Sequence, residues 1–339
     1  MKKTLLFVLF ISFTTLAQDF KTPVEYLNFI GKEHNAISAS TWKYTKAVAH
    51  SKRARKIDNT RKDLLKSIQT ASKKISATNG YKGDTEYRDQ LLSYLSISES
   101  YINDDYAKII DMQEVAEQSY DLMEAYILAR DLVNKKINDE VEKVNSYQKA
   151  FADKYGVKIT DEETELGKKM AISNEVFNHQ SDMYLLFFKV YITDANLMQS
   201  IEAKDISAIQ QNTAALEQFA NEGLEKLKGL KTYKNDPLLI NATKKVLEFY
   251  KKEAVEFGPK AVDFLMLNEK VPDTKKALEA KKAPTKEEIT AFNKMVADVN
   301  KAGAEYNKLN TKFFNDKNSA INSWNTASDG FVSKHVPKD

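Results

Sequence analysis

The feature that most restricts the fold is a ten-residue run, Met183–Ile192, which reads MYLLFFKVYI. Nine of its ten residues are apolar or aromatic, and Lys189 carries its one charge. On a helix, side chains spaced by about 100° would cover most of the circumference, as in a helix packed on several sides. Acidic residues flank the run closely, and it is much shorter than the roughly 20 residues that span a bilayer. The run therefore predicts the central, buried rod of a helical bundle.

The rest of the chain also predicts helices. Glycine and proline are scarce, with 10 and 6 residues, and they sit where helices should begin or end. Alternating apolar residues, the signal for a half-buried strand, are absent. Capping boxes open helices at Thr22–Glu25 and Thr285–Glu288. We therefore expect an all-α fold, an elongated bundle of about six to eight long antiparallel helices, in a single domain over residues 18–339.

Several interruptions of the helical pattern are visible. Asn79–Asp84 holds two glycines and predicts a tight turn, and Gly156 should end a long helix. The lysine-rich segment Val271–Pro284 holds two prolines and is the best candidate for a mobile loop. The apolar register fails across residues 51–57, and the polar residues Asn103, Asp104 and Asp105 interrupt another pattern. The sequence leaves open whether the helices break there or only kink.

The N-terminus predicts export. Lys2 and Lys3 precede the apolar run Leu5–Phe13, and small residues lead up to Ala17. These are the three parts of a secretory signal peptide, so we expect residues 1–17 to be removed. No later stretch is long and apolar enough to anchor the chain in a membrane. The expected location is the periplasm, the cell surface or the extracellular space.

The amino-acid composition restricts the kinds of chemical site that the chain can contain. The chain has no cysteine, which excludes disulfides, thiolate catalysis, cysteine metal sites and lipid attachment through an N-terminal cysteine. The expected mature chain is therefore soluble and not lipidated in that way. The formal charge falls from +3 to +1 when Lys2 and Lys3 are removed, so bulk charge favours no particular partner.

Charge is nevertheless placed unevenly. Lys43–Lys74 holds eleven cations and two anions, whereas Glu99–Glu124 holds eight anions and one cation. The stretch Lys52–Lys62 could bind an anion such as a lipid headgroup or nucleic acid; its candidate residues are Lys52, Arg53, Arg55 and Lys56. The simpler interpretation is an antiparallel hairpin about the Asn79–Asp84 turn, in which the basic arm lies beside the acidic arm near Asp104 and Asp105.

The last predicted helix carries a coiled-coil rhythm. Apolar residues recur at spacings of three and four along a seam that includes Ile289, Phe292, Val296, Val299 and Tyr306. The seam could receive an external helical partner. Because Gly303 and Asn310 interrupt it, we favour antiparallel packing inside the bundle.

One cluster resembles a chemical site. Glu175, His179 and Asp182 are spaced by four and three residues, so their side chains can converge on one helix face. They could bind a divalent metal or act as acid and base. However, Glu175, Asp182 and Lys189 recur every seven residues, as on the solvated edge of a helix. We favour a structural role and expect no cofactor.

Three segments carry a resemblance. Gly83–Arg88, the run Tyr184–Ile192 and the ending Ser333–Pro337 resemble a family of exported bacterial helical proteins described only as surface proteins. The likeness covers nearly the whole chain after the leader. It implies export and a helical fold, and it implies no catalytic residues.

These observations give three hypotheses for function. The first is a non-enzymatic envelope or surface protein that acts through its helical surfaces. Its partner is unknown, with an envelope protein or a glycan as the expected class and nucleic acid disfavoured. The second is a metal-dependent or acid–base enzyme centred on Glu175, His179 and Asp182. The third is anion binding through Lys52–Lys62. No phosphate loop, dinucleotide motif, nucleophile elbow or HExxH motif occurs in the sequence, which favours the first.

Overall fold

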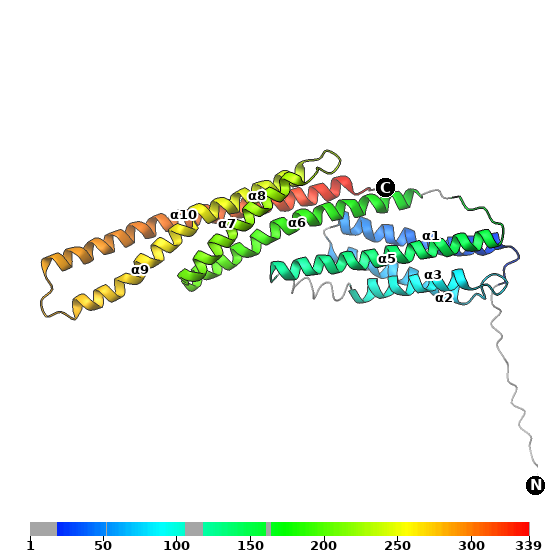
Figure 1. Ribbon diagram of the computed structural model, residues 1–339, viewed down its shortest axis with the longest axis horizontal. Coiled ribbons are helices and arrows are strands. Elements are labelled where there is room, and N and C mark those ends of the chain that lie inside the picture. Colours follow the sequence, from blue (N-terminus) through cyan, green and yellow to red (C-terminus); the bar gives the residue numbers. More distant parts are fainter. Residues whose placement is uncertain (1–18, 52, 106–117, 161–163, 339) are drawn as a thin grey trace, which may run out of the picture. The chain divides into compact units, whose positions relative to one another are not determined.

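The computed structural model describes residues 19–51, 53–105, 118–160 and 164–338. These residues form nine α-helices and one π-helical segment, η1, and they contain no β-strand (Figure 1). The predicted all-α class is confirmed. Helices outnumber the six to eight expected because two short junctions, at Ser51–Arg53 and at Phe257, end one helix and begin another.

The contacts within the chain divide it into two compact units, where the sequence predicted one domain. Unit 1 comprises residues 1–108 and 131–166, and unit 2 comprises residues 109–130 and 167–339. Helix α5 (Tyr120–Lys154) contributes to both. The physical reason for the difference is that the central run Met183–Ile192 belongs to unit 2, whereas unit 1 has a hydrophobic core of its own.

Unit 1 contains α1 (Pro23–His50), α2 (Ala54–Ser76) and α3 (Glu86–Ser100), with η1 (Tyr101–Asp105) directly after α3. The predicted cap at the start of α1 is present, because the Thr22 side chain accepts a hydrogen bond from the Glu25 N–H at 3.1 Å. Ser51 and Arg53 are extended, so the lost register marks a true helix break. The polar residues at 103–105 belong to the π-helical segment rather than to a loop.

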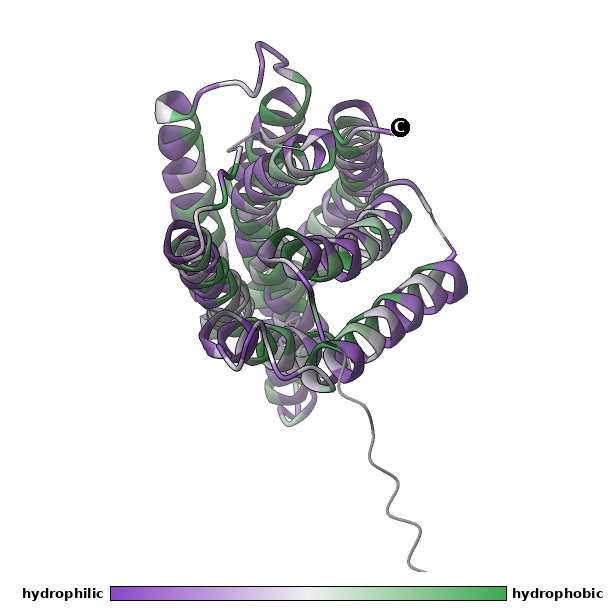
Figure 2. Ribbon diagram, turned by 90° about the vertical axis from the view of Figure 1, so that its right-hand side faces the viewer, coloured by the Kyte–Doolittle hydropathy of each residue, from purple (hydrophilic) through white to green (hydrophobic). Residues whose placement is uncertain are grey.

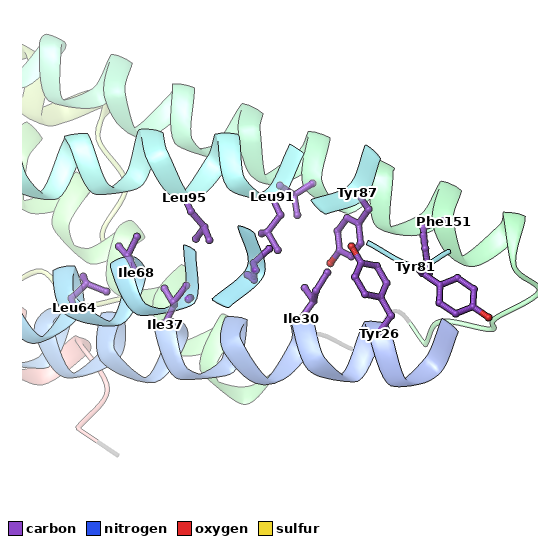
Figure 3. Close-up of a cluster of buried hydrophobic side chains, with 13 residues drawn as sticks. Tyr26, Ile30, Ile37, Leu64, Ile68, Tyr81, Tyr87, Leu91, Leu95 and Phe151 are labelled. Atoms are coloured by element: carbon purple, nitrogen blue, oxygen red, sulfur yellow. The ribbon is translucent and has the colours of Figure 1, made fainter. Parts of the chain in front are cut away.

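The core of unit 1 is built from the inward faces of α1, α2, α3 and α5 (Figure 3). Phe151 of α5 lies at its aromatic end, with ring centroids 5.1 Å from Tyr26, 6.1 Å from Tyr81 and 4.7 Å from Tyr155. The apolar face of α2 is buried in this core: Leu64, Ile68, Ala71 and Ile75. Val48, near the end of α1, is 42% exposed.

The predicted turn at Asn79–Asp84 joins α2 to α3. Tyr81 and Asp84 exchange two backbone hydrogen bonds, at 3.2 and 3.0 Å. Gly80 has φ +69°, and a Cβ there would lie 1.9 Å from the Asp84 carbonyl oxygen, so the position requires glycine. The Asp84 carboxylate also accepts from Lys154 Nζ at 2.8 Å, which ties the turn to the end of α5. Gly156, with φ +67°, follows that end as predicted.

Unit 2 contains α6 (Glu165–Ala203), α7 (Ile206–Gly229), α8 (Leu238–Glu256), α9 (Gly258–Glu279) and α10 (Lys286–His335). The Thr285–Glu288 capping box is present at the start of α10. The loop expected over Val271–Pro284 is wrong as far as Glu279, because α9 continues to that residue with Pro272 inside it; only residues 280–285 are non-helical. The residues after Pro272 are mostly lysine, alanine, leucine and glutamate, which favour helix and outweigh one proline.

The central run lies in α6; four of its residues are buried, as predicted, whereas Tyr191 is 40% exposed. Met183, Phe187, Phe188 and Val190 are all at most 5% exposed. The Phe187 ring stacks on Trp324 of α10, with centroids 4.3 Å apart and planes 10° apart. Close side-chain packing of this kind anchors α6 to α10.

The heptad seam of α10 packs inside unit 2. Helix α10 lies against α8 and α9, and a Cβ at Gly303 would come 3.0 Å from the Phe264 ring of α9. Gly303, which weakens the seam for a free-standing dimer, is thus the point of closest approach to α9. This arrangement supports the antiparallel interpretation over an external helical partner.

The helices carry hydrophobic and hydrophilic residues side by side around their axes (Figure 2). Within the described ranges, none of the helices combines the length and apolar character needed to cross a membrane.

Candidate functional site

The predicted carboxylate–histidine cluster lies on α6, where aromatic residues from α10 and the α7–α8 turn cover it. The His179 ring lies 5.2 Å from the Phe331 ring and 6.1 Å from the Tyr233 ring, centroid to centroid. Glu175 Oε2 accepts a hydrogen bond from the Tyr233 hydroxyl at 3.2 Å. Glu175 therefore interacts with a residue that the sequence had not connected to this cluster.

The surroundings of His179 favour its neutral form over the protonated form. Burial lowers its pKa below the ordinary value, the nearby His335 lowers it further, and the Asp182 carboxylate opposes both. His179 Nε2 is buried and has no hydrogen-bond partner among the described residues. An imidazole packed at a tilt against two aromatic rings contributes to packing as well as to polar contacts.

A second polar cluster, missed by the sequence analysis, lies beside His179. Asp236 Oδ2 contacts Lys334 Nζ at 2.7 Å and His335 Nε2 at 2.8 Å, and Asp236 Oδ1 accepts from the Leu238 N–H at 2.9 Å. The His335 ring packs edge-to-face on Tyr233 with centroids 5.1 Å apart. We call Tyr233, Asp236, Lys334 and His335 the C-terminal clasp, because they join the end of α10 to the α7–α8 turn.

The charged groups of the clasp bind one another. The ammonium group of Lys334, with the Leu238 N–H and His335, holds the pKa of Asp236 well below its usual range against the opposing effect of burial. Both carboxylate oxygens of Asp236 already accept hydrogen bonds. Among the described residues, no three His, Asp or Glu side chains are placed to hold a metal ion. The arrangement therefore gives the metal hypothesis for Glu175, His179 and Asp182 no support.

We predict that Asp236→Asn lowers the free energy of unfolding of unit 2 by about 1–2 kcal/mol at pH 7, because it removes charge-assisted hydrogen bonds. Since the folded pKa of Asp236 lies below the unfolded value, its contribution is present above about pH 4 and is lost as the pH falls further. The difference between variant and parent should therefore shrink at pH 3. Urea unfolding followed by Trp324 fluorescence, with Trp42→Phe in both proteins, measures it.

The control for this prediction is Asp298→Asn, which removes an exposed carboxylate from α10. It should change the unfolding free energy by less than about 0.5 kcal/mol at either pH. If Asp236→Asn lowered the free energy of unfolding equally at both pH values, the clasp would act through shape rather than charge.

A third cluster is buried between α6, α8 and α10. Lys317 Nζ lies 2.7 Å from Asp194 Oδ1 and 3.1 Å from Glu253 Oε1. Their side chains are 13%, 6% and 1% exposed, in that order. We call these three residues the buried triad. Nearby, the Tyr250 hydroxyl is buried and has no hydrogen-bond partner among the described residues.

The buried triad has two carboxyl groups and one ammonium group. Burial raises the pKa of both Glu253 and Asp194; the neighbouring Asp194 raises that of Glu253 further, and Lys317 opposes the shift. We therefore expect the two carboxyl groups to retain a proton near neutral pH. A buried cluster that bonds mainly to itself fixes three helices in register but offers little access to a substrate.

Unit 2 also has an open groove of about 550 Å³ between α7 and the α8–α9 junction. Its polar lining includes Gln210, Thr213, Glu217 and Asp263. No imidazole or cationic side chain is among its lining residues, so it lacks the positive charge that phosphate binding needs.

The anion-binding candidates lie at the α1–α2 junction. Arg53, Arg55 and Lys56 are exposed, while Lys52 lies outside the described residues. The predicted hairpin is present: Gln69 donates to Glu99 at 2.8 Å, and Arg61 donates to the Ile102 carbonyl at 3.3 Å. The side chains of Asp104 and Asp105 lie outside the described residues, so their expected pairing with Arg53 and Arg55 stays a prediction.

Comparison of the chain with protein-family models, with curated proteins and with solved structures gives no match.

Proposed function

We propose that this chain is a non-enzymatic, exported protein of the cell envelope or cell surface that binds its partner through its helical surfaces. The observation that carries this proposal is how the interior ionisable groups of unit 2 are used. In the clasp Asp236 bonds to Lys334, His335 and a backbone N–H, and in the buried triad Lys317 bonds to Asp194 and Glu253. Each set joins helices that are far apart in the sequence.

The predicted leader supports the envelope location, and the absence of cysteine argues against thiol attachment to a lipid. The remaining surface is a set of long, exposed helix faces. Such faces present many weak contacts over a wide area, which suits a protein or glycan partner better than a small substrate.

Two measurements test the proposal. The N-terminal sequence of the chain recovered from the envelope or the medium should begin at Gln18. Immobilised folded chain should enrich a defined envelope component, while heat-denatured chain should not. Retention of the leader, or enrichment of nothing together with a chelator-sensitive catalytic activity in the pure protein, would contradict the proposal.

A further inference from the structure

Helix α2 carries four cations in one line. Arg55, Lys62, Lys66 and Lys73 are separated by seven, four and seven residues. At 100° per residue they project within about 40° of one another, and they extend over about 27 Å at 1.5 Å per residue. The opposite face of α2 is buried in the core of unit 1. We call these four residues the basic stripe; it faces away from that core.

The basic stripe keeps most of its charge available. All four side chains are exposed, with Lys62 at 64%. Within the described part of the chain, only Lys62 of the four has an ion-pair partner, Asp58 at 2.7 Å. The acidic residues of α2 itself are Asp58 and Asp63, and Glu99 of α3 accepts a hydrogen bond from Gln69 beside the stripe; the side chains of Asp104 and Asp105 lie outside the described residues. A run of cations with so few counter-charges favours an external anionic partner.

The N-terminus of α2 adds to the positive electrostatic potential of the basic stripe. Arg53 occupies its N-cap without a side-chain cap hydrogen bond, and the first turn contains no acidic residue. The helix dipole places partial positive charge at this end, next to Arg55 and Lys56.

The form of the stripe distinguishes between anionic partners. Its four charges lie on a single straight helix, so they can meet a flat surface together. Helix α2 has no aromatic residue, so it lacks the stacking platforms that single-stranded nucleic acid requires. Three of the four are lysines, which act as point charges rather than as the planar forks that read phosphate or base geometry. These features fit an anionic bilayer surface best.

We propose that the basic stripe docks the protein on the surface of an anionic lipid bilayer. The inference rests on the proposed function, because it names the partner of one of the surfaces through which that function would operate. Its test is independent, because loss of lipid binding would leave the enrichment of a protein or glycan unaffected.

Vesicle sedimentation tests the proposal. The chain from Gln18 onward is mixed with vesicles of 30% phosphatidylglycerol in phosphatidylcholine, or of phosphatidylcholine alone, in 0.1 M salt. We expect binding to the anionic vesicles only, and release in 0.5 M salt. Replacing the stripe by Arg55→Gln, Lys62→Gln, Lys66→Gln and Lys73→Gln should weaken binding at least about tenfold.

The matched control removes the same charge elsewhere: Lys245→Gln, Lys251→Gln, Lys260→Gln and Lys301→Gln, all exposed and in unit 2. It should weaken binding by less than about threefold. If the stripe variant fails to fold by circular dichroism, the pairs Arg55→Gln with Lys62→Gln and Lys66→Gln with Lys73→Gln replace it. Equal losses in stripe and control variants, no binding to anionic vesicles, or tighter binding to a DNA duplex than to vesicles would each overturn the proposal.

Discussion

Lys317→Met should destabilise unit 2 by about 3–5 kcal/mol at pH 7, because it leaves Asp194 and Glu253 buried without their cation. The loss should grow as the pH rises from 5 to 8. With Lys317 gone, both carboxyl groups must hold protons in the folded state, and deprotonation in the unfolded state becomes more favourable with pH. Urea unfolding monitored by Trp324 measures the effect.

Two comparisons make this prediction specific. Lys312→Met removes a half-exposed lysine that pairs with Asp316 on the same helix, and it should cost less than about 0.5 kcal/mol. Combining Lys317→Met with Asp194→Asn and Glu253→Gln removes all three charges and should recover most of the lost stability. A loss below about 1 kcal/mol for Lys317→Met alone would mean that water reaches the triad.

Phe151→Ala should destabilise unit 1 by about 3–5 kcal/mol, because Phe151 is 4% exposed and contacts the rings of Tyr26, Tyr81, Tyr87 and Tyr155. The chain has two tryptophans, Trp42 in α1 of unit 1 and Trp324 in α10 of unit 2. With Trp324→Phe, the fluorescence of Trp42 reports unit 1; with Trp42→Phe, that of Trp324 reports unit 2.

We expect Phe151→Ala to move the Trp42 transition to lower urea and to leave the Trp324 transition within experimental error. Phe314→Ala, which removes a ring that is 62% exposed, serves as the control and should move neither by much. If Phe151→Ala moved both transitions equally, the two units would unfold as one cooperative body through the shared helix α5.

The helical elements could be read from the sequence because their signals are local. The buried face of α2, the burial of Met183–Ile192 and the glycine turn before α3 depend on residues within a few turns of one another. The division into two units could not be read, because it depends on which buried faces meet. Nothing in the sequence of α1 or α6 says that the two helices belong to different cores.

The polar clusters show the same limit of local information. Glu175, His179 and Asp182 lie on one helix and were visible at once, whereas Asp236 meets Lys334 and His335 across about a hundred residues of chain. The buried triad joins residues from three helices. No spacing rule connects such residues. The one available hint was that the α10 segment around Phe313 and Lys317 shows an apolar face interrupted by a charge.

The central claim is that the exposed helix faces, rather than the interior clusters, carry the function. Binding to anionic vesicles and enrichment of envelope material should be compared for the unaltered chain, the basic-stripe variant and His179→Gln. We predict that His179→Gln keeps both properties within about twofold, because His179 lies among packed aromatic rings, while the stripe variant loses vesicle binding. A folded His179→Gln variant that loses both properties, with the stripe variant unchanged, would contradict the account.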